Sequence, residues 1–100
     1  MRRSISPTTV ANTPEIKTSA GVALAENRDR RAWNIQNLGT NALFVRLGGT
    51  ASTTVFHRVL KAGTSNDDGT GGSYGESAGL VFGGEITVAG TSPRFVVRES

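Results

Sequence analysis

Apolar and polar residues alternate along two stretches near the middle of this chain, in the pattern that half-buried β-strands show. In residues 31–37 the apolar positions are Trp33 and Ile35, and a second alternating set follows in residues 42–48. The residues between them, Leu-Gly-Thr-Asn at 38–41, are typical of a turn. The pattern therefore predicts two strands that pair as an antiparallel hairpin.

Further short strands are predicted along the rest of the chain, at residues 21–26, 54–60, 80–82, 85–89 and 94–99. The stretch 54–60 is apolar on both faces, and residues 64–79, which hold five glycines and three acidic residues, are predicted to form an outward-facing loop. Many short strands separated by frequent turns predict an all-β fold, a small antiparallel β-sandwich or barrel. The expected core consists of Trp33, Ile35, Leu43, Val45, Leu47, Ile86, Val88 and Val97.

The first 18 residues differ from the rest, because they hold two of the three prolines among serines and threonines. Their apolar residues, Ile5, Val10 and Ile16, are too sparse to form a core face. We expect residues 1–18 to be an extended N-terminal arm and residues 19–100 to be a single β-sandwich domain. The arm is either a frayed terminus or a segment that lies across a neighbouring subunit, with these three apolar residues as anchors.

The composition supports a strand-rich chain and removes several classes of function. Glycine (13), threonine (12) and serine (9) are abundant and lysine (2) is scarce, so a helical bundle is not expected. The chain has no cysteine and a single histidine, His57, which excludes disulfides, thiolate zinc sites and multi-histidine metal sites. No apolar run is long enough to span a bilayer or to follow the basic first residues as a signal peptide, so we expect no membrane partner.

The formal net charge is +3 and the sequence pI is about 10.2, and nine of the 11 basic residues are arginines. Only Arg28, Arg30 and Arg31 form a cluster, which Glu26 and Asp29 dilute. This dispersion does not favour nucleic-acid binding, which usually requires a charged stripe or face. Arginine in place of lysine favours fixed, two-pronged hydrogen bonding at protein interfaces.

The candidate metal-binding, catalytic and phosphate-binding residues do not match the spacing of a known metal site, catalytic motif or phosphate-binding loop. Residues 66–69, Asn-Asp-Asp-Gly, invite a calcium interpretation, but the position of the bidentate glutamate falls on Gly75. They form either a solvated loop or a weak two-carboxylate cation site. A catalytic role for His57 would require a nucleophile, but no serine of the chain lies in a nucleophile motif such as Gly-x-Ser-x-Gly. Residues 69–72 are not followed by the lysine of a phosphate-binding loop. We therefore expect no enzymatic activity, no bound metal and no cofactor.

Four amides, Asn34, Gln36, Asn37 and Asn41, lie around the predicted hairpin beside Trp33. Amides next to an aromatic ring hold sugars in many lectin-like sandwiches, but they also bond a neighbouring subunit or an edge strand. Because Trp33 is expected to face the core, the pattern favours the second interpretation over sugar binding.

Residues 30–48 resemble a pattern in small virion proteins of tailed bacteriophages. The pattern is an arginine, a strand that ends in Ile-Gln-Asn, a turn, a second strand and Leu-Gly. Leu-Lys-Ala-Gly at 60–63 and the closing residues 90–97 also fit, so the resemblance spans roughly residues 28–98. It implies a capsid decoration (cement) protein, β-rich and homotrimeric, without a catalytic motif. The loop at 64–79 departs from the pattern.

On this resemblance we expect a structural virion protein that decorates and stabilises the phage head shell by non-covalent contacts with the major capsid protein. It would be made in the host cytoplasm and carried on the outer surface of the head. Arg28, Arg30 and Arg31 would dock on an acidic shell surface. The alternative is a carbohydrate- or receptor-binding module of a phage tail or fibre, and a cellular interaction domain of the same fold is a third interpretation.

Overall fold

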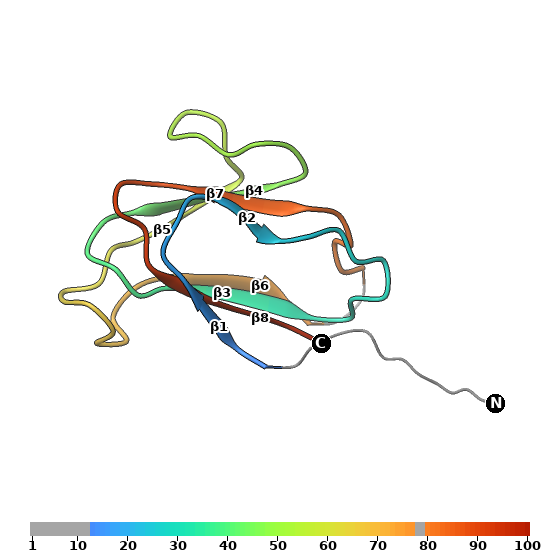
Figure 1. The fold of residues 1–100 in the computed structure, drawn as a ribbon, viewed down its shortest axis with the longest axis horizontal. Coiled ribbons are helices and arrows are strands. Elements are labelled where there is room, and N and C mark those ends of the chain that lie inside the picture. Colours follow the sequence, from blue (N-terminus) through green and yellow to red (C-terminus); the bar gives the residue numbers. More distant parts are fainter. Residues whose placement is uncertain (1–12, 78–79) are drawn as a thin grey trace.

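The computed structural model describes residues 13–77 and 80–100, which form two antiparallel sheets packed face to face (Figure 1). These ranges contain eight strands and no helix: β1 (Glu15–Lys17), β2 (Gly21–Leu24), β3 (Trp33–Asn37), β4 (Leu43–Leu47), β5 (Arg58–Leu60), β6 (Ser73–Glu76), β7 (Ile86–Ala89) and β8 (Phe95–Glu99). Sheet A, the lower sheet in Figure 1, has the order β1-β8-β3-β6, and sheet B has the order β2-β7-β4-β5. The predicted all-β sandwich is confirmed.

The strand pairs are nested along the chain. Strand β1 pairs with β8, β2 with β7, β3 with β6 and β4 with β5, and the pairs β3–β8 and β4–β7 complete the two sheets. A long hairpin rolled into two four-stranded sheets in this order is a jelly roll. Successive strands mostly belong to different sheets, so the loops gather at the two ends of the sandwich.

The predicted hairpin of β3 and β4 is wrong, because the two strands lie in different sheets. Residues 38–42 carry the chain from sheet A to sheet B. The Asn37 side chain holds this crossing: its amide nitrogen donates to the carbonyl of Asn41 at 2.8 Å, and its oxygen accepts from the backbone N–H of Gly39 at 2.9 Å. The turn residues were recognised correctly, but they turn the chain between layers.

Three other predicted segments differ from the structure. The strand expected at 54–60 is reduced to β5, because residues 48–57 fold back over the outer face of sheet B (Figure 1). The loop expected at 64–79 contains β6, which pairs with β3 along its whole length. Residues 80–82 form no strand, and the backbone N–H of Phe82 instead donates to the Glu76 carboxylate at 2.9 Å.

The core lies between the sheets and is built from the alternate, inward-facing residues of each strand. It contains Ala23, Trp33, Ile35, Leu43, Val45, Leu60, Ile86, Val88, Phe95 and Val97. Seven of the eight predicted core residues are buried, and the eighth, Leu47, is partly buried against them. Phe95, which was not predicted, is among the fully buried side chains.

Candidate functional site

The three clustered arginines lie in different environments. Arg28 is exposed and pairs with Glu26, with 2.9 Å between the Nε and Oε2 atoms. Arg31 is also exposed, and its backbone N–H donates to the carbonyl of Ser100. An exposed pair such as Arg28–Glu26 contributes little to stability, so both arginines are open to a partner.

Arg30, by contrast, is an internal residue. Its side chain has no exposed surface and forms a 2.9 Å ion pair with Glu99 of β8. The guanidinium also donates to the carbonyl oxygens of Phe82, Gly84 and Ala25. Arg30 therefore ties the β2–β3 and β6–β7 loops to the end of β8, and in this fold it is not exposed to dock on a shell as the sequence led us to expect.

Of the three apolar anchors proposed for the N-terminal arm, the structure describes Ile16. Ile5 and Val10 lie outside the described residues. Ile16 lies on β1, which pairs with β8 at the edge of sheet A, so residues 15–17 of the expected arm belong to the sheet. The Ile16 side chain is 54% exposed on the outer face, where a partner can reach it.

The acidic residues of the predicted 64–79 loop are held by donors of the chain itself. Arg94 donates to both carboxylate oxygens of Asp67 at 2.8 Å, which lowers the pKa of Asp67 and raises that of Arg94. Hydrogen bonds from Thr70, with others from Ser65, lower the pKa of Asp68 to about 2. These bonds give both carboxylates a role in shaping the loop, and the described residues contain no cluster of three potential metal ligands.

The amide side chains around Trp33 lie in different environments, some buried and some on the outer face of sheet A. Asn37 is buried, and its amide nitrogen bonds the backbone carbonyls of Leu60 and Lys61 as well as that of Asn41. Trp33 is 3% exposed, and its ring nitrogen donates to Glu76 at 2.7 Å. The indole is therefore not available as a platform for a sugar. Asn34 and Gln36 face outward from β3.

His57 has a structural contact in the loop between β4 and β5. The Nδ1 atom of His57 accepts a hydrogen bond from the backbone N–H of Leu47 at 3.0 Å, and the backbone N–H of His57 donates to the carbonyl of Val45. This contact continues the β4–β5 pairing beyond β5. His57 therefore has a structural role in holding the loop against β4.

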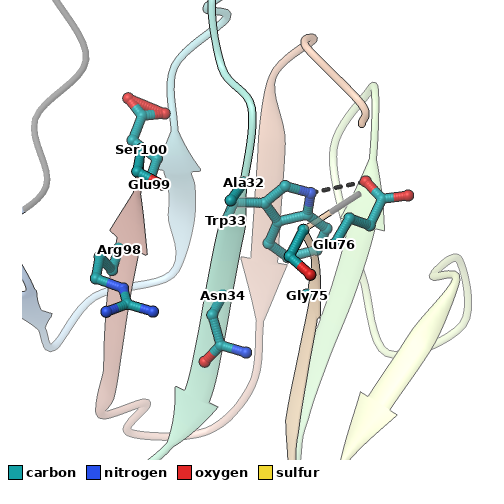
Figure 2. Close-up of a pocket in the computed structure, with 9 residues that line it drawn as sticks. Ala32, Trp33, Asn34, Gly75, Glu76, Arg98, Glu99 and Ser100 are labelled. Carbon is teal, nitrogen blue, oxygen red and sulfur yellow. Dashed lines mark hydrogen bonds between the residues drawn. The ribbon is translucent and has the colours of Figure 1, made fainter. Parts of the chain in front are cut away.

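Two shallow depressions open on the outer face of sheet A. The first has a volume of about 200 Å³ and lies where β3, β6 and β8 are side by side (Figure 2). The second, of about 190 Å³, is lined by Pro14, Val96 and Val97. Asn34 and Arg98, which are directly opposite each other on β3 and β8, line both depressions. Two carboxylates, Glu76 and Glu99, also line the first depression. Trp33 bonds the first and Arg30 pairs with the second. The site therefore offers hydrogen bonding, the Arg98 guanidinium and two carboxylates that are already bonded.

The outer face of sheet B carries an exposed apolar patch, which we call the β4–β5 apolar patch and define as Phe44, Val55, Phe56 and Val59. The Phe44 and Phe56 rings pack with their centres 4.9 Å apart, and Val59 is directly opposite Phe44 on β5. Val55, Phe56 and Val59 are 48%, 39% and 51% exposed. Exposed apolar side chains gathered in this way make the patch a candidate interaction surface.

Sequence reasoning missed both surfaces, for different reasons. The stretch 54–60, apolar on both faces, was a usable signal for the β4–β5 apolar patch, because a strand at the edge of a sandwich has only one face to bury. No local signal joins Asn34 to Arg98, since their pairing depends on β3 and β8 being neighbours in sheet A.

A scan against protein-family models and searches of the curated proteins and of the solved structures found no match. The described part of the chain also contains no helix that is long and apolar enough to cross a membrane. Function is therefore inferred from the surfaces of the chain itself.

Proposed function

We propose that this chain is a structural virion protein, a homotrimer that decorates and stabilises the head shell of a tailed bacteriophage through non-covalent contacts with the major capsid protein. The resemblance of residues 30–48 to small virion proteins motivates the proposal. The jelly roll supports it by analogy, because this architecture recurs in viral capsid proteins. The same architecture also serves lectins, so the surfaces must carry the argument.

The β4–β5 apolar patch is the observation that carries the proposal. Exposed phenylalanine and valine side chains are costly to leave in water, and permanent interfaces between subunits are the most apolar of protein interfaces. A chain of 100 residues also has a thin core, and burial between subunits adds to its stability. The patch is thus suited to contact between copies within a trimer.

The chain can stabilise the shell if it binds the assembled lattice more tightly than the dissociated subunits of the lattice. A trimer that binds the assembled lattice but not its dissociated subunits shifts the equilibrium towards the assembled form. The exposed arginines Arg28 and Arg31 and the exposed Ile16 are available for contacts with the shell. The buried Trp33 favours this function over a sugar-binding module, since the indole has no free face.

Two measurements test the proposal. Light scattering on the purified full chain should give a mass of three chains. The chain should also co-sediment, to saturation, with heads assembled from the major capsid protein encoded in the same genome, and should raise the temperature at which those heads dissociate. A stable monomer that does not sediment with the heads would overturn the proposal. Selective binding to a glycan array by that monomer would favour the tail-module alternative.

A further inference from the structure

The outer face of sheet A differs in character from the β4–β5 apolar patch. Its side chains form two cross-strand rows: Ile16, Val96, Gln36 and Ser73 in one, and Arg98, Asn34 and Gly75 in the other. The first row is apolar at its β1 end, where Pro14 precedes the strand. The second row places a guanidinium beside a carboxamide. Arg98 is the charged residue of these two rows. The Glu76 and Glu99 carboxylates line the depression beside it, but they are already bonded to Trp33 and Arg30.

Arg98 differs from most other arginines of the described residues in having nothing to bind. Arg28, Arg30 and Arg94 each pair with a carboxylate, Arg46 donates to the carbonyl of Thr50, and Arg58 lies 4.7 Å over the ring of Tyr74. Within the described ranges no carboxylate forms an ion pair with Arg98. An exposed guanidinium presents a fork of donors that matches a carboxylate, and Asn34 adds a further donor from β3.

The space around the Asn34–Arg98 pair suits a ligand with both acidic and apolar groups. On one side, Pro14 and Val96 give the 190 Å³ depression an apolar part beside Asn34 and Arg98. An apolar cavity of about 150 Å³ accommodates a benzene ring, so one large apolar side chain fits here. On the other side, Gly75 lines the first depression together with Asn34 (Figure 2).

We propose that the outer face of sheet A binds an extended acidic peptide segment of a partner protein, with a carboxylate on Arg98 and Asn34 and a neighbouring apolar side chain on Val96, Pro14 and Ile16. The inference rests on the proposed function, in which the partner is the head-shell protein. The Arg98 guanidinium forms no ion pair within the described ranges and therefore favours a carboxylate, and the apolar row beside it favours an apolar group next to the acid. An acidic sugar supplies the first feature but lacks the second.

The test is a titration of the isotopically labelled full chain with N-acetyl-Leu-Glu amide, followed by amide NMR shifts. The neutral N-acetyl-Leu-Gln amide and glucuronate are the comparison ligands. The acidic dipeptide should give saturable shifts at Asn34, Gly75, Val96 and Arg98, whereas the neutral dipeptide should bind at least about tenfold more weakly because the charge-assisted bonds are lost. Arg98→Gln should weaken binding of the acidic dipeptide to the same extent.

Lys61→Gln is the matched control, because it removes the same charge from an exposed residue at the end of the sandwich and should leave the titration unchanged. Equal shifts with both dipeptides, shifts confined to the β4–β5 apolar patch, or no saturation up to the solubility of the peptide would overturn the proposal. Glucuronate binding that exceeds dipeptide binding would replace the peptide with an acidic sugar.

The two proposals fail separately. If Arg98→Gln still co-sediments with the heads at wild-type affinity, this face is not the shell contact, although the chain remains a decoration protein. If the acidic dipeptide binds at Arg98 but the wild-type chain does not bind heads, the peptide site stands and the proposed function falls.

Discussion

The Nε atom of Arg30 lies 2.9 Å from the Glu99 carboxylate, and the Arg30 side chain has no exposed surface. The two residues are 69 positions apart, and their ion pair joins the segment before β3 to the end of β8. Asn27 donates to the second oxygen of Glu99 at 3.3 Å, so the carboxylate is bonded on both sides. A charge placed so deep is stable only because every part of the guanidinium has a partner.

Replacement of Arg30 by Met should therefore destabilise the fold by about 3–5 kcal/mol, because it leaves the Glu99 carboxylate and three backbone carbonyls without their donor. Urea unfolding of the full chain measures this loss. Arg31→Met, at the exposed neighbouring position, should change stability by less than about 0.5 kcal/mol. A stable Arg30→Met variant with weakened partner binding would contradict the internal role and restore Arg30 as a docking residue.

The contrast between Arg30 and its neighbours shows what the sequence can and cannot predict. Alternation of apolar and polar residues shows which face of a strand is buried, and it placed Trp33, Ile35, Val88 and Val97 in the core. It does not show which strands are neighbours. In a jelly roll most pairs join distant segments, so β3 took β6 and β8 as partners instead of the adjacent β4.

The candidate sites were harder to predict for the same reason. Arg28, Arg30 and Arg31 carry identical groups within four positions, but Arg30 alone of the three is buried, by a loop more than 50 residues away. The pairing of Asn34 with Arg98 likewise exists only once β3 and β8 are in register. Surface chemistry made by distant strands becomes visible only in the folded chain.

Trp33 should be a major contributor to stability. Its buried indole packs edge-on against Tyr74, with the ring centres 5.1 Å apart, and bonds Glu76. Trp33→Ala should cost about 3–5 kcal/mol, measured by urea unfolding. Trp33→Phe should cost less, because it keeps most of the packing and loses mainly one hydrogen bond, worth about 1 kcal/mol. A near-neutral Trp33→Ala that loses binding to a glycan would instead favour the sugar interpretation.

Acid should weaken the fold through the loop that precedes β6. The pKa of Asp68 is about 2 in the folded chain against its ordinary value of 3.8, so folding favours the ionised form. Its stabilising contribution is complete above the unfolded pKa and is lost as the pH falls from about 4 to about 2. The lowered pKa of Asp67 acts in the same direction.

Asp68→Asn separates this effect from general acid denaturation. The variant should be less stable than the wild type at neutral pH, because the amide accepts the bonds from Thr70 and Ser65 less strongly than a carboxylate does. The difference in urea midpoint should shrink through the same pH range and vanish near its lower end. A difference that is constant with pH would show that Asp68 acts through packing instead of charge.

The β4–β5 apolar patch gives the sharpest test of self-association. Val59→Thr removes apolar surface that is half exposed in the single chain, so it should change the free energy of unfolding by less than about 1 kcal/mol. Phe56→Ser also loses the ring contact with Phe44 and should cost about 1–2 kcal/mol, which leaves the chain folded. Each should nevertheless shift the light-scattering mass from three chains towards one, because the apolar contact between copies is lost. Val22→Thr, on β2 at the opposite edge of sheet B, removes the same kind of exposed group and should leave the trimer intact. If all three variants stay trimeric, the copies meet through another face. If Val22→Thr dissociates the trimer while Phe56→Ser does not, the interface lies along the β2 edge.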